Sequence, residues 1–350
     1  MTLLAGITSR VVPTVRLSVN ILERAADQAS TPADRTVVLV HGNVSSALFW
    51  QELMLAMPEG LRVIAVDLRG FGGTQTLPVD ASRGCRDFSD DVHATLEALG
   101  LGAVHLVGWS MGGGVVMQYA LDHPVLSLTL QAPVSPYGFG GTRADGSLLT
   151  PDGTGTGGGG ANPDFVQRLA NGDTSDEAPT SPRSVFRSSY VSPGFASEHE
   201  DLWVESMLTT ATGPENYPGD AVPSESWPGF GAGTRGVLNS LAPTNFTTAG
   251  LVDLEVKPPV LWIRGSADAI VSDESYFDLN MLGKAGVIPG WPGDDVAPPQ
   301  PMVTQTRAVL DAYAAAGGSY REVVFEGVGH SPHLERPAEV VEAIVAHVTG

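Results

Sequence analysis

The chain has 350 residues, of which 42% are hydrophobic, and a formal net charge of −20 at pH 7. This composition is typical of a globular protein and excludes a disordered chain, and the length allows one domain with an insertion or two domains. The negative charge disfavours nucleic acid and anionic membranes as partners, because both would repel the protein.

The start of the chain does not resemble a targeting segment. Residues 1–7 lack a basic stretch, and their apolar run is too short for a signal peptide. No stretch of about 20 apolar residues is long enough to span a membrane. Cys85 is the single cysteine, so no intramolecular disulfide can form and the redox compartment stays open. We therefore expect a cytoplasmic location.

Predicted strands and helices alternate from the N-terminal region to Pro133. Alternating or continuous apolar side chains predict strands over residues 15–24, 36–40, 62–66, 104–108 and 126–130. Helices are predicted between these strands, beginning at a capping serine at 45 or 46, at residue 87, and after Ser110. Short links between alternating elements predict an α/β fold, a mostly parallel central sheet with helices on both faces.

The alternation stops after Pro133 and resumes at Pro259. The residues between are rich in Gly, Pro, Ser and Thr, with helix-like pieces at 164–170 and 196–211. We interpret 135–255 as an insertion of short helices and long loops, and its scattered aromatic residues favour a functional role over disorder. The predicted organisation is thus a core of residues 1–134 and 256–350 with the insertion 135–255.

The second part of the core repeats the earlier pattern. Strands are predicted at 259–264 and 321–325, and helices at 303–316 and 337–348. A second segment rich in Gly and Pro covers 283–301. The sequence shows no internal repeat.

The stretch from Val104 to Gly114 predicts a strand, a sharp turn and a helix, with Ser110 at the tip of the turn. Gly108 and Gly112 flank the serine, and a side chain at either position would collide with the neighbouring strand or helix. The turn would expose the hydroxyl group of Ser110 beside the first free N–H groups of a helix. A plain serine and glycine turn before a helix remains the alternative interpretation.

Two other strand ends carry the groups that a reactive serine needs. A serine hydroxyl requires an adjacent base, and the base requires a third group that orients it. Asp268 follows the strand at 259–264, and His330 follows the strand at 321–325. Catalytic groups in parallel sheets gather at the carboxyl ends of the strands. Alternatives are His333 as the base and Asp273 or Asp253 as the acid.

These residues belong to five motifs through which the chain resembles α/β hydrolases with a lid, or cap, inserted after the sixth strand. The resemblance covers about residues 15–133 and 258–350, and the order of serine, acid and histidine is the order of that family. The motifs are His41-Gly42, Asp67-x-Arg69-Gly70-x-Gly72, Gly108-x-Ser110-x-Gly112, Gly265-x-x-Asp268 and Gly329-His330.

The resemblance implies a role for each matching residue. Ser110 would be the nucleophile, His330 the general base and then acid, and Asp268 the group that orients His330. The oxyanion hole would be formed by the backbone N–H groups of Asn43 and Met111. Haloalkane dehalogenases and epoxide hydrolases are similar but use an aspartate nucleophile, whereas serine suits acyl chemistry.

Several other residues have a structural and a functional interpretation. Four aromatic residues are candidates for lining the pocket, although plain packing is the favoured interpretation of each: Trp50, Trp109, Tyr137 and Trp227. Structural roles are expected for five histidines: His41, His93, His105, His123 and His199. Asp67 is expected to fix its own loop. The run of glycines at 157–160 lacks the Lys-Ser/Thr of a phosphate-binding loop.

The resulting hypothesis is a serine hydrolase that cleaves a carboxylic ester, with a lactone as a special case. The expected lid indicates a bulky or apolar substrate. Hydrolysis of a C–C bond, an amide or a thioester, and perhydrolysis, would use the same triad. A slow or non-catalytic small-molecule receptor, or a protein that uses 135–255 as a partner surface, are alternatives of other classes. No metal or cofactor is expected, and the oligomeric state is open.

Overall fold

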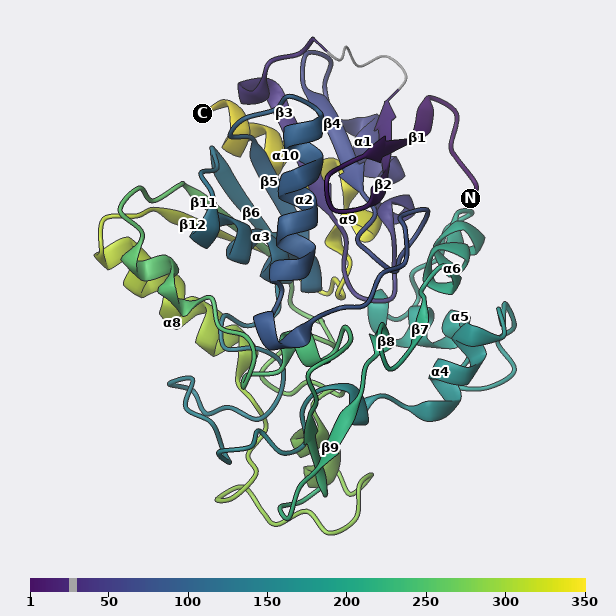
Figure 1. Cartoon of the computed structure of the whole chain (residues 1–350), viewed down its shortest axis with the longest axis vertical. Helices are drawn as coiled ribbons and strands as arrows, with labels where there is room; N and C mark the ends of the chain where they lie inside the picture. Colours follow the sequence, from purple (N-terminus) through teal and green to yellow (C-terminus); the bar gives the residue numbers. More distant parts are fainter. Residues whose placement is uncertain (25–29) are drawn as a thin grey trace.

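The computed structural model describes residues 1–24 and 30–350. Its central sheet has eight strands in the order β1-β2-β4-β3-β5-β6-β11-β12 (Figure 1). The strands from β4 to β12 in this order are parallel, and β1 and β2 pair antiparallel at one edge. The bounds are β1 Ile7–Pro13, β2 Ser18–Arg24, β3 Thr36–Val40, β4 Arg62–Val66, β5 His105–Trp109, β6 Ser127–Gln131, β11 Val260–Gly265 and β12 Tyr320–Phe325. The predicted mostly parallel sheet is therefore confirmed.

Helices cover both faces of this sheet, and the hydrophobic core lies between the two layers. Helices α2 and α3 pack together on one face, and the short helix η7 contacts both α3 and α8 (Figure 1). Helices α1, α9 and α10 pack together on the opposite face. The bounds are η2 Ala47–Trp50, α1 Gln51–Ala56, α2 Arg86–Ala98, α3 Met111–Asp122, η7 Ala249–Asp253, α8 Met302–Ala315, α9 Pro332–Glu335 and α10 Pro337–Thr349. None of the helices in the described part of the chain is long and apolar enough to cross a membrane.

The N-terminal strands differ from the prediction of one strand over residues 15–24. The chain forms a hairpin of β1 and β2, whose turn is closed by a hydrogen bond from the backbone N–H of Thr14 to the carbonyl of Leu17. Val15 is 93% exposed in this turn, so its apolar side chain belongs to no buried face. Only Ile7 and Val12 of β1 are buried, because β1 is an edge strand, and such a strand shows no alternation in the sequence.

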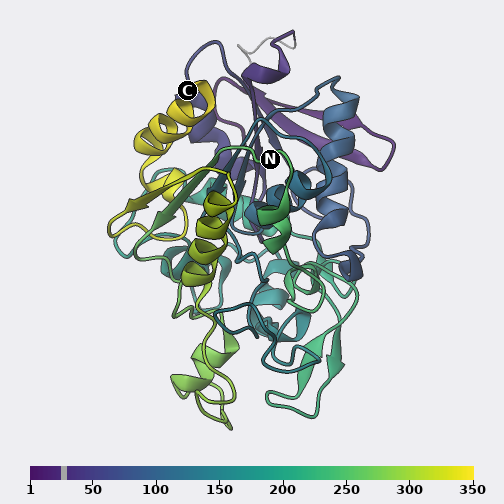
Figure 2. The same cartoon turned by 90° about the vertical axis from the view of Figure 1, so that its left-hand side faces the viewer.

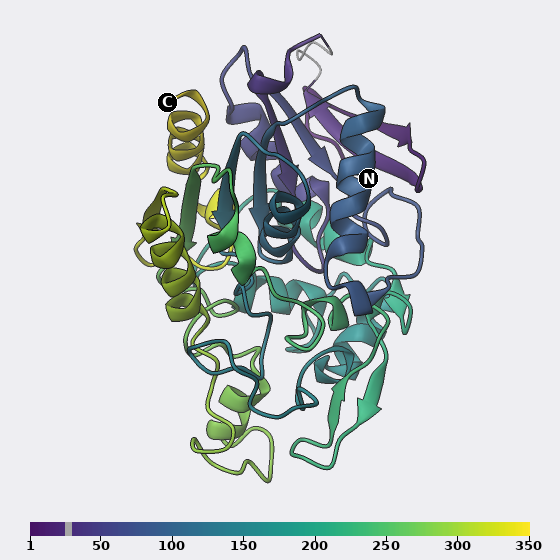
Figure 3. The same ribbon diagram turned by 60° about the vertical axis from the view of Figure 1, so that its left-hand side comes forward.

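Apart from η7, which packs beside α3, most of the residues between β6 and β11 lie beyond the carboxyl ends of the parallel strands (Figures 2 and 3). Residues 212–250, predicted to be loop-like, contain four strands of two or three residues in two separate pairs. Strands this short leave no periodic pattern in a sequence. The elements here are η4 Gly158–Gly160, α4 Pro163–Ala170, α5 Pro182–Val185, the π-helix η5 Phe186–Tyr190, α6 Glu200–Leu208, β7 Thr212–Gly213, β8 Tyr217–Pro218, β9 Ala221–Pro223, β10 Phe230–Ala232 and η6 Asn239–Leu241.

The segment between β11 and α8 contacts the segment between β6 and β11, and we call these two the covering segments. The former contains helix α7 (Leu279–Lys284). The indole Nε1 of Trp227 donates a hydrogen bond of 2.9 Å to the carbonyl oxygen of Pro289. Farther along, the side-chain carbonyl of Gln300 accepts a hydrogen bond of 2.5 Å from the backbone N–H of Gly140. Two parts of the chain that are distant in sequence therefore build one cover over the strand ends.

Replacing Gly108 with alanine is expected to lower the free energy of unfolding by roughly 3 kcal/mol, because the core is overpacked. A Cβ atom at this position in β5 would lie 2.2 Å from the carbonyl oxygen of Gly112 and 2.7 Å from the backbone nitrogen of Gly113. Both are backbone atoms that cannot rotate away. Gly102→Ala is the matched control, because nothing lies within 4 Å of its Cβ position. Urea unfolding of the two variants checks the prediction, and equal midpoints would contradict it.

Candidate active site

Ser110 lies at the sharp turn between β5 and α3, with a φ of 57° and a ψ of −119°. A positive φ is rare for a residue with a side chain, and such strain is typical of a turn that holds a reactive group. The close approach predicted for the flanking glycines is confirmed, since a Cβ at Gly112 would lie 2.3 Å from the carbonyl oxygen of Val40. The glycines thus let α3 begin directly against the strands.

Asp268 and His330 form a buried pair at the ends of β11 and β12. The Nδ1 atom of His330 lies 2.8 Å from Oδ2 of Asp268, and the two side chains are 2% and 3% exposed. The other carboxylate oxygen of Asp268 accepts hydrogen bonds from the backbone N–H groups of Ile270 and Val271. The carboxylate is therefore fixed in place, and it selects the tautomer of His330 that carries its proton on Nδ1.

The backbone around Ser110 offers two hydrogen-bond donors. Neither the N–H of Asn43 nor that of Met111 donates a hydrogen bond within the described part of the chain. A Cβ built on Gly42 would lie 3.0 Å from the Cβ of Ser110, so the chain before Asn43 runs directly beside the serine. Met111 begins α3, where the first N–H groups have no partner inside the helix. Buried N–H groups without a partner suit an anionic oxygen.

The alternative base and acids lie in different surroundings. His333 is completely buried, its ring lies 4.4 Å from that of Trp50, and burial lowers its pKa well below the usual range. The exposed carboxylate of Asp273 accepts hydrogen bonds from the N–H and hydroxyl groups of Thr304 at the start of α8. Asp253 is exposed at the end of η7. The geometry therefore brings together Asp268 and His330 rather than these alternatives.

A cavity of about 390 Å³ opens at this edge of the sheet. Ser110, His330, Asn43 and Met111 all lie on its wall. The rest of the wall is largely apolar and comes from both covering segments, with Phe139, Phe165, Leu238, Leu241, Phe277 and Leu279 among its residues. A cavity of this size suits a small organic molecule.

None of the four aromatic residues expected as pocket lining lies on the wall of this cavity. Trp50 and Trp109 are completely buried, and the indole Nε1 of Trp109 donates to the backbone carbonyl of His330 at 2.8 Å. Tyr137 packs over Gly146, and Trp227 contacts Gly283 in the second covering segment. Their candidate role in lining the pocket is therefore not found, and Trp50 and Trp109 pack in the core, which is the interpretation that the sequence favoured.

Tyr190 and Asp278 are two polar residues among the many wall residues that the sequence did not predict. The hydroxyl of Tyr190 donates to the backbone carbonyl of Asn43 at 3.0 Å and lies 3.4 Å from that of Val44. Val44 has a φ of 46°, so this hydrogen bond holds a strained turn beside the serine. Both residues belong to the covering segments, where no sequence motif marks a residue that contacts the site.

The expected structural roles of Asp67 and His41 are confirmed. The buried carboxylate of Asp67 accepts hydrogen bonds from the backbone N–H groups of Ala47 and Gly73, which ties two strand-end loops together. The Nε2 atom of His41 accepts from the N–H of Leu68 at 3.0 Å, and its Nδ1–H donates to the carbonyl of Gly42. Burial lowers the pKa of His41 to about 4, so the ring is neutral at physiological pH.

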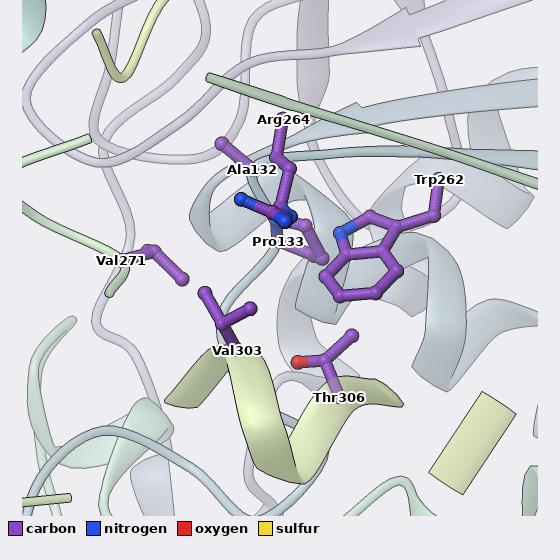
Figure 4. A pocket seen from close by; sticks show the side chains of 7 residues that line it. All are labelled: Ala132, Pro133, Trp262, Arg264, Val271, Val303 and Thr306. Atoms are coloured by element: carbon purple, nitrogen blue, oxygen red, sulfur yellow. The ribbon is translucent and has the colours of Figure 1, made fainter. Parts of the chain in front are cut away.

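A second depression lies between β11 and α8 and shares Val271 with the wall of the first cavity (Figure 4). Trp262 and Arg264 of β11 and Val303 and Thr306 of α8 line it, and it leaves no room for a water molecule. Its charged group already has a partner, since the guanidinium of Arg264 forms an ion pair of 2.7 Å with Glu322. Within residues 1–24 and 30–350, no group of three or more His, Cys, Asp or Glu side chains is arranged to hold a metal ion.

The chain is similar in sequence to known hydrolases. A profile described as the alpha/beta hydrolase family matches residues 37–343. Monoacylglycerol lipase abhd6-A of Xenopus laevis is 34% identical over 102 residues, which make up 28% of this chain and 30% of that protein. The chain thus matches about a third of the length of its curated relatives.

Solved structures show the same fold. The esterase RhEst1 from Rhodococcus sp. ECU1013 has a TM-score of 0.60 and 18% sequence identity, covering 98% of each chain. The epoxide hydrolase CorEH has a TM-score of 0.60 and 18% identity, covering 97% of this chain and 98% of its own. At this level of identity the likeness concerns the fold alone, because one fold carries different chemistries.

Proposed function

Because the chain belongs to the alpha/beta hydrolase family, we propose that it is a serine hydrolase that cleaves carboxylic esters through an acyl-enzyme on Ser110. The observation that carries this proposal is the buried pair of His330 and Asp268, whose histidine lies on the same cavity wall as the strained Ser110. Lactones, which are cyclic esters, are included as a special case.

In the proposed reaction, the Oγ atom of Ser110 attacks the carbonyl carbon of the ester. Nε2 of His330 takes the hydroxyl proton and then gives it to the alkoxide oxygen, so the alcohol leaves and the acyl group stays on the serine. A water molecule, deprotonated by the same nitrogen, releases the acid. Asp268 orients His330 and stabilises the imidazolium that forms in each half of the reaction.

The negative oxygen of each tetrahedral intermediate needs hydrogen-bond donors. The free N–H groups of Asn43 and Met111 are proposed for this role, since both residues lie on the cavity wall with Ser110. Such donors are effective because they are fixed before the reaction, and the loss of one typically costs about 3–4 kcal/mol of transition-state stabilisation.

We further propose that residues 135–255 act as a cap over this site. Support comes from the many wall residues that this segment contributes, among them Phe165, Tyr190 and Leu241. Apolar walls and exclusion of water favour an apolar acyl or alcohol group in the substrate.

A fluorophosphonate probe tests the proposal, because it forms a covalent bond with an activated serine. Intact-mass analysis of the probe-treated protein is expected to show one adduct, and a peptide map is expected to locate it on Ser110. Turnover of p-nitrophenyl esters of increasing acyl length then defines the substrate range. A folded protein that forms no adduct and cleaves no ester would leave the chain a binding protein rather than an enzyme.

Replacing Tyr190 with phenylalanine is expected to lower kcat about tenfold and to leave KM nearly unchanged. The variant keeps the ring but loses the hydrogen bond to the carbonyl of Asn43, so the proposed oxyanion donor is less well placed in the transition state. Burial raises the pKa of Tyr190, so its hydroxyl remains a donor over the working pH range.

Tyr217→Phe is the matched control for this prediction. Tyr217 is also buried and on the cavity wall, but its hydroxyl makes no hydrogen bond to Asn43 or Val44. Steady-state kinetics and the affinity for a boronic acid that mimics the tetrahedral intermediate separate the two variants. A rise in KM without a fall in kcat for Tyr190→Phe would show that the tyrosine contacts substrate and does not position the oxyanion donor.

A further inference from the structure

The cavity wall is uneven in charge. Asp278 is its single carboxylate, and no lysine or arginine is found among the described residues that line it. His330, which also lies on the wall, already has a partner in Asp268. A substrate that enters this cavity therefore meets one carboxyl group and no lysine or arginine side chain that would balance a negative charge of its own.

Asp278 is an unusual residue to find in such a wall. Asp278 is 3% exposed, and its side chain caps the start of α7. Its carboxylate oxygens accept hydrogen bonds from the backbone N–H groups of Asn280 at 3.0 Å and Gln300 at 2.7 Å. No lysine, arginine or histidine of the described chain forms an ion pair with it. Each oxygen of a carboxylate can accept two hydrogen bonds, so both oxygens keep unused capacity.

A comparison with Asp67 shows what is particular to Asp278. Asp67 is also buried without a cation, but it accepts three hydrogen bonds, from Asn20, Ala47 and Gly73, and lies outside the cavity. Burial raises the pKa of both carboxyl groups, because an ion is poorly solvated there. Asp278 has one donor fewer and faces a space that a ligand can fill, so a positive group in the cavity would stabilise its ionised form.

We propose that Asp278 is the subsite for a cationic group of the substrate, an ammonium carried at the end of an apolar acyl chain. Esters with a carboxylate at that end are excluded by the same side chain. This inference rests on the proposed ester hydrolysis at Ser110 and deepens it, because it assigns a charge to the substrate.

The test uses three series of p-nitrophenyl esters with the same acyl length, over about four to ten carbons. One series ends in a trimethylammonium group, one in the isosteric and neutral tert-butyl group, and one in a carboxylate. At the length that reaches Asp278, kcat/KM is expected to be about tenfold higher for the cation than for the neutral ester. The carboxylate series is expected to fall at least tenfold below the neutral one.

The Asp278→Asn variant is expected to remove the preference for the cation, so that the ratio of kcat/KM for the cationic ester to that for the neutral ester falls from about ten to about one. Asparagine caps helices as well as aspartate does, so this variant keeps the start of α7. Asp295→Asn is the matched control, because it removes the same charge from an exposed position in the same segment. Equal kcat/KM for cationic and neutral esters at every length in the wild-type protein would overturn the proposal without any variant.

Binding to the Ser110→Ala variant keeps this test independent of the reaction. Calorimetric titration of this variant with the cationic and neutral esters is expected to give a dissociation constant about tenfold lower for the cation. If no ester is turned over but the cation still binds more tightly, the proposed chemistry fails and the subsite stands. If esters are cleaved without regard to charge, the subsite fails and the chemistry stands.

Discussion

The Ser110→Ala variant is expected to lose roughly 10⁴–10⁶-fold in kcat on any ester that the wild-type protein cleaves. The alanine removes the atom that forms the acyl-enzyme, and water activated by His330 is a poor replacement. Some acceleration over the uncatalysed reaction remains, because the donors at Asn43 and Met111 still stabilise the intermediate. Steady-state kinetics with p-nitrophenyl esters measure the loss.

The same variant has a second readout that separates chemistry from folding. The fluorophosphonate adduct is expected to disappear from the intact-mass spectrum, while the midpoint of urea unfolding stays close to that of the wild type. Little change is expected because alanine adopts the same positive φ as serine at this turn and removes only a hydroxyl group on the cavity wall. Unchanged ester turnover in Ser110→Ala would refute the assigned nucleophile.

The Asp268→Asn variant is expected to lower kcat by about 10⁴-fold. The carboxylate oxygen that faces Nδ1 of His330 becomes either an amide oxygen without charge or an amide nitrogen. In the second case the amide favours the tautomer with its proton on Nε2, and that nitrogen can no longer accept the proton of Ser110. The imidazolium also loses its counter-charge in the transition state.

Asp273→Asn is the control for this variant. Asp273 lies five residues further along and is exposed, and it bonds only to Thr304 among the described residues. Its replacement removes one negative charge near the same loop and is expected to change kcat less than twofold. A larger loss of kcat in Asp273→Asn than in Asp268→Asn would show that Asp268 is the wrong assignment for the acid of the triad.

The sequence was most informative where strands end at the site. Ser110 and Asp268 follow largely apolar runs, and such runs are typical of strands that are covered on both faces. His330 follows the shorter apolar run Val323–Phe325 at the end of the edge strand β12. The carboxyl ends of parallel strands meet at one edge, so three residues separated by up to 220 positions were predicted to come together. The positions of these strand ends depend on local apolar runs and on the parallel arrangement of the sheet, and both can be predicted from the sequence.

The cavity wall was predicted far less well, and the reason is physical. Tyr190 acts from a five-residue π-helix and Asp278 from the start of a six-residue helix, and elements this short have no periodic signature. Large aromatic residues were expected to line the pocket, but Trp50 and Trp109 gain more from complete burial beneath it. Which side chain faces the cavity depends on contacts between segments that are distant in sequence.

The construction of the cover from two chain segments bears on how this protein can be re-engineered. A chimera that transplants residues 135–255 onto a related scaffold would carry the indole of Trp227 without the carbonyl of Pro289 that accepts its hydrogen bond. It would also leave the backbone N–H of Gly140 without the side-chain carbonyl of Gln300 that accepts its hydrogen bond. The exchangeable unit is thus a pair, residues 135–255 together with 276–301, and only a graft of both would transfer the shape of the cavity to a new host.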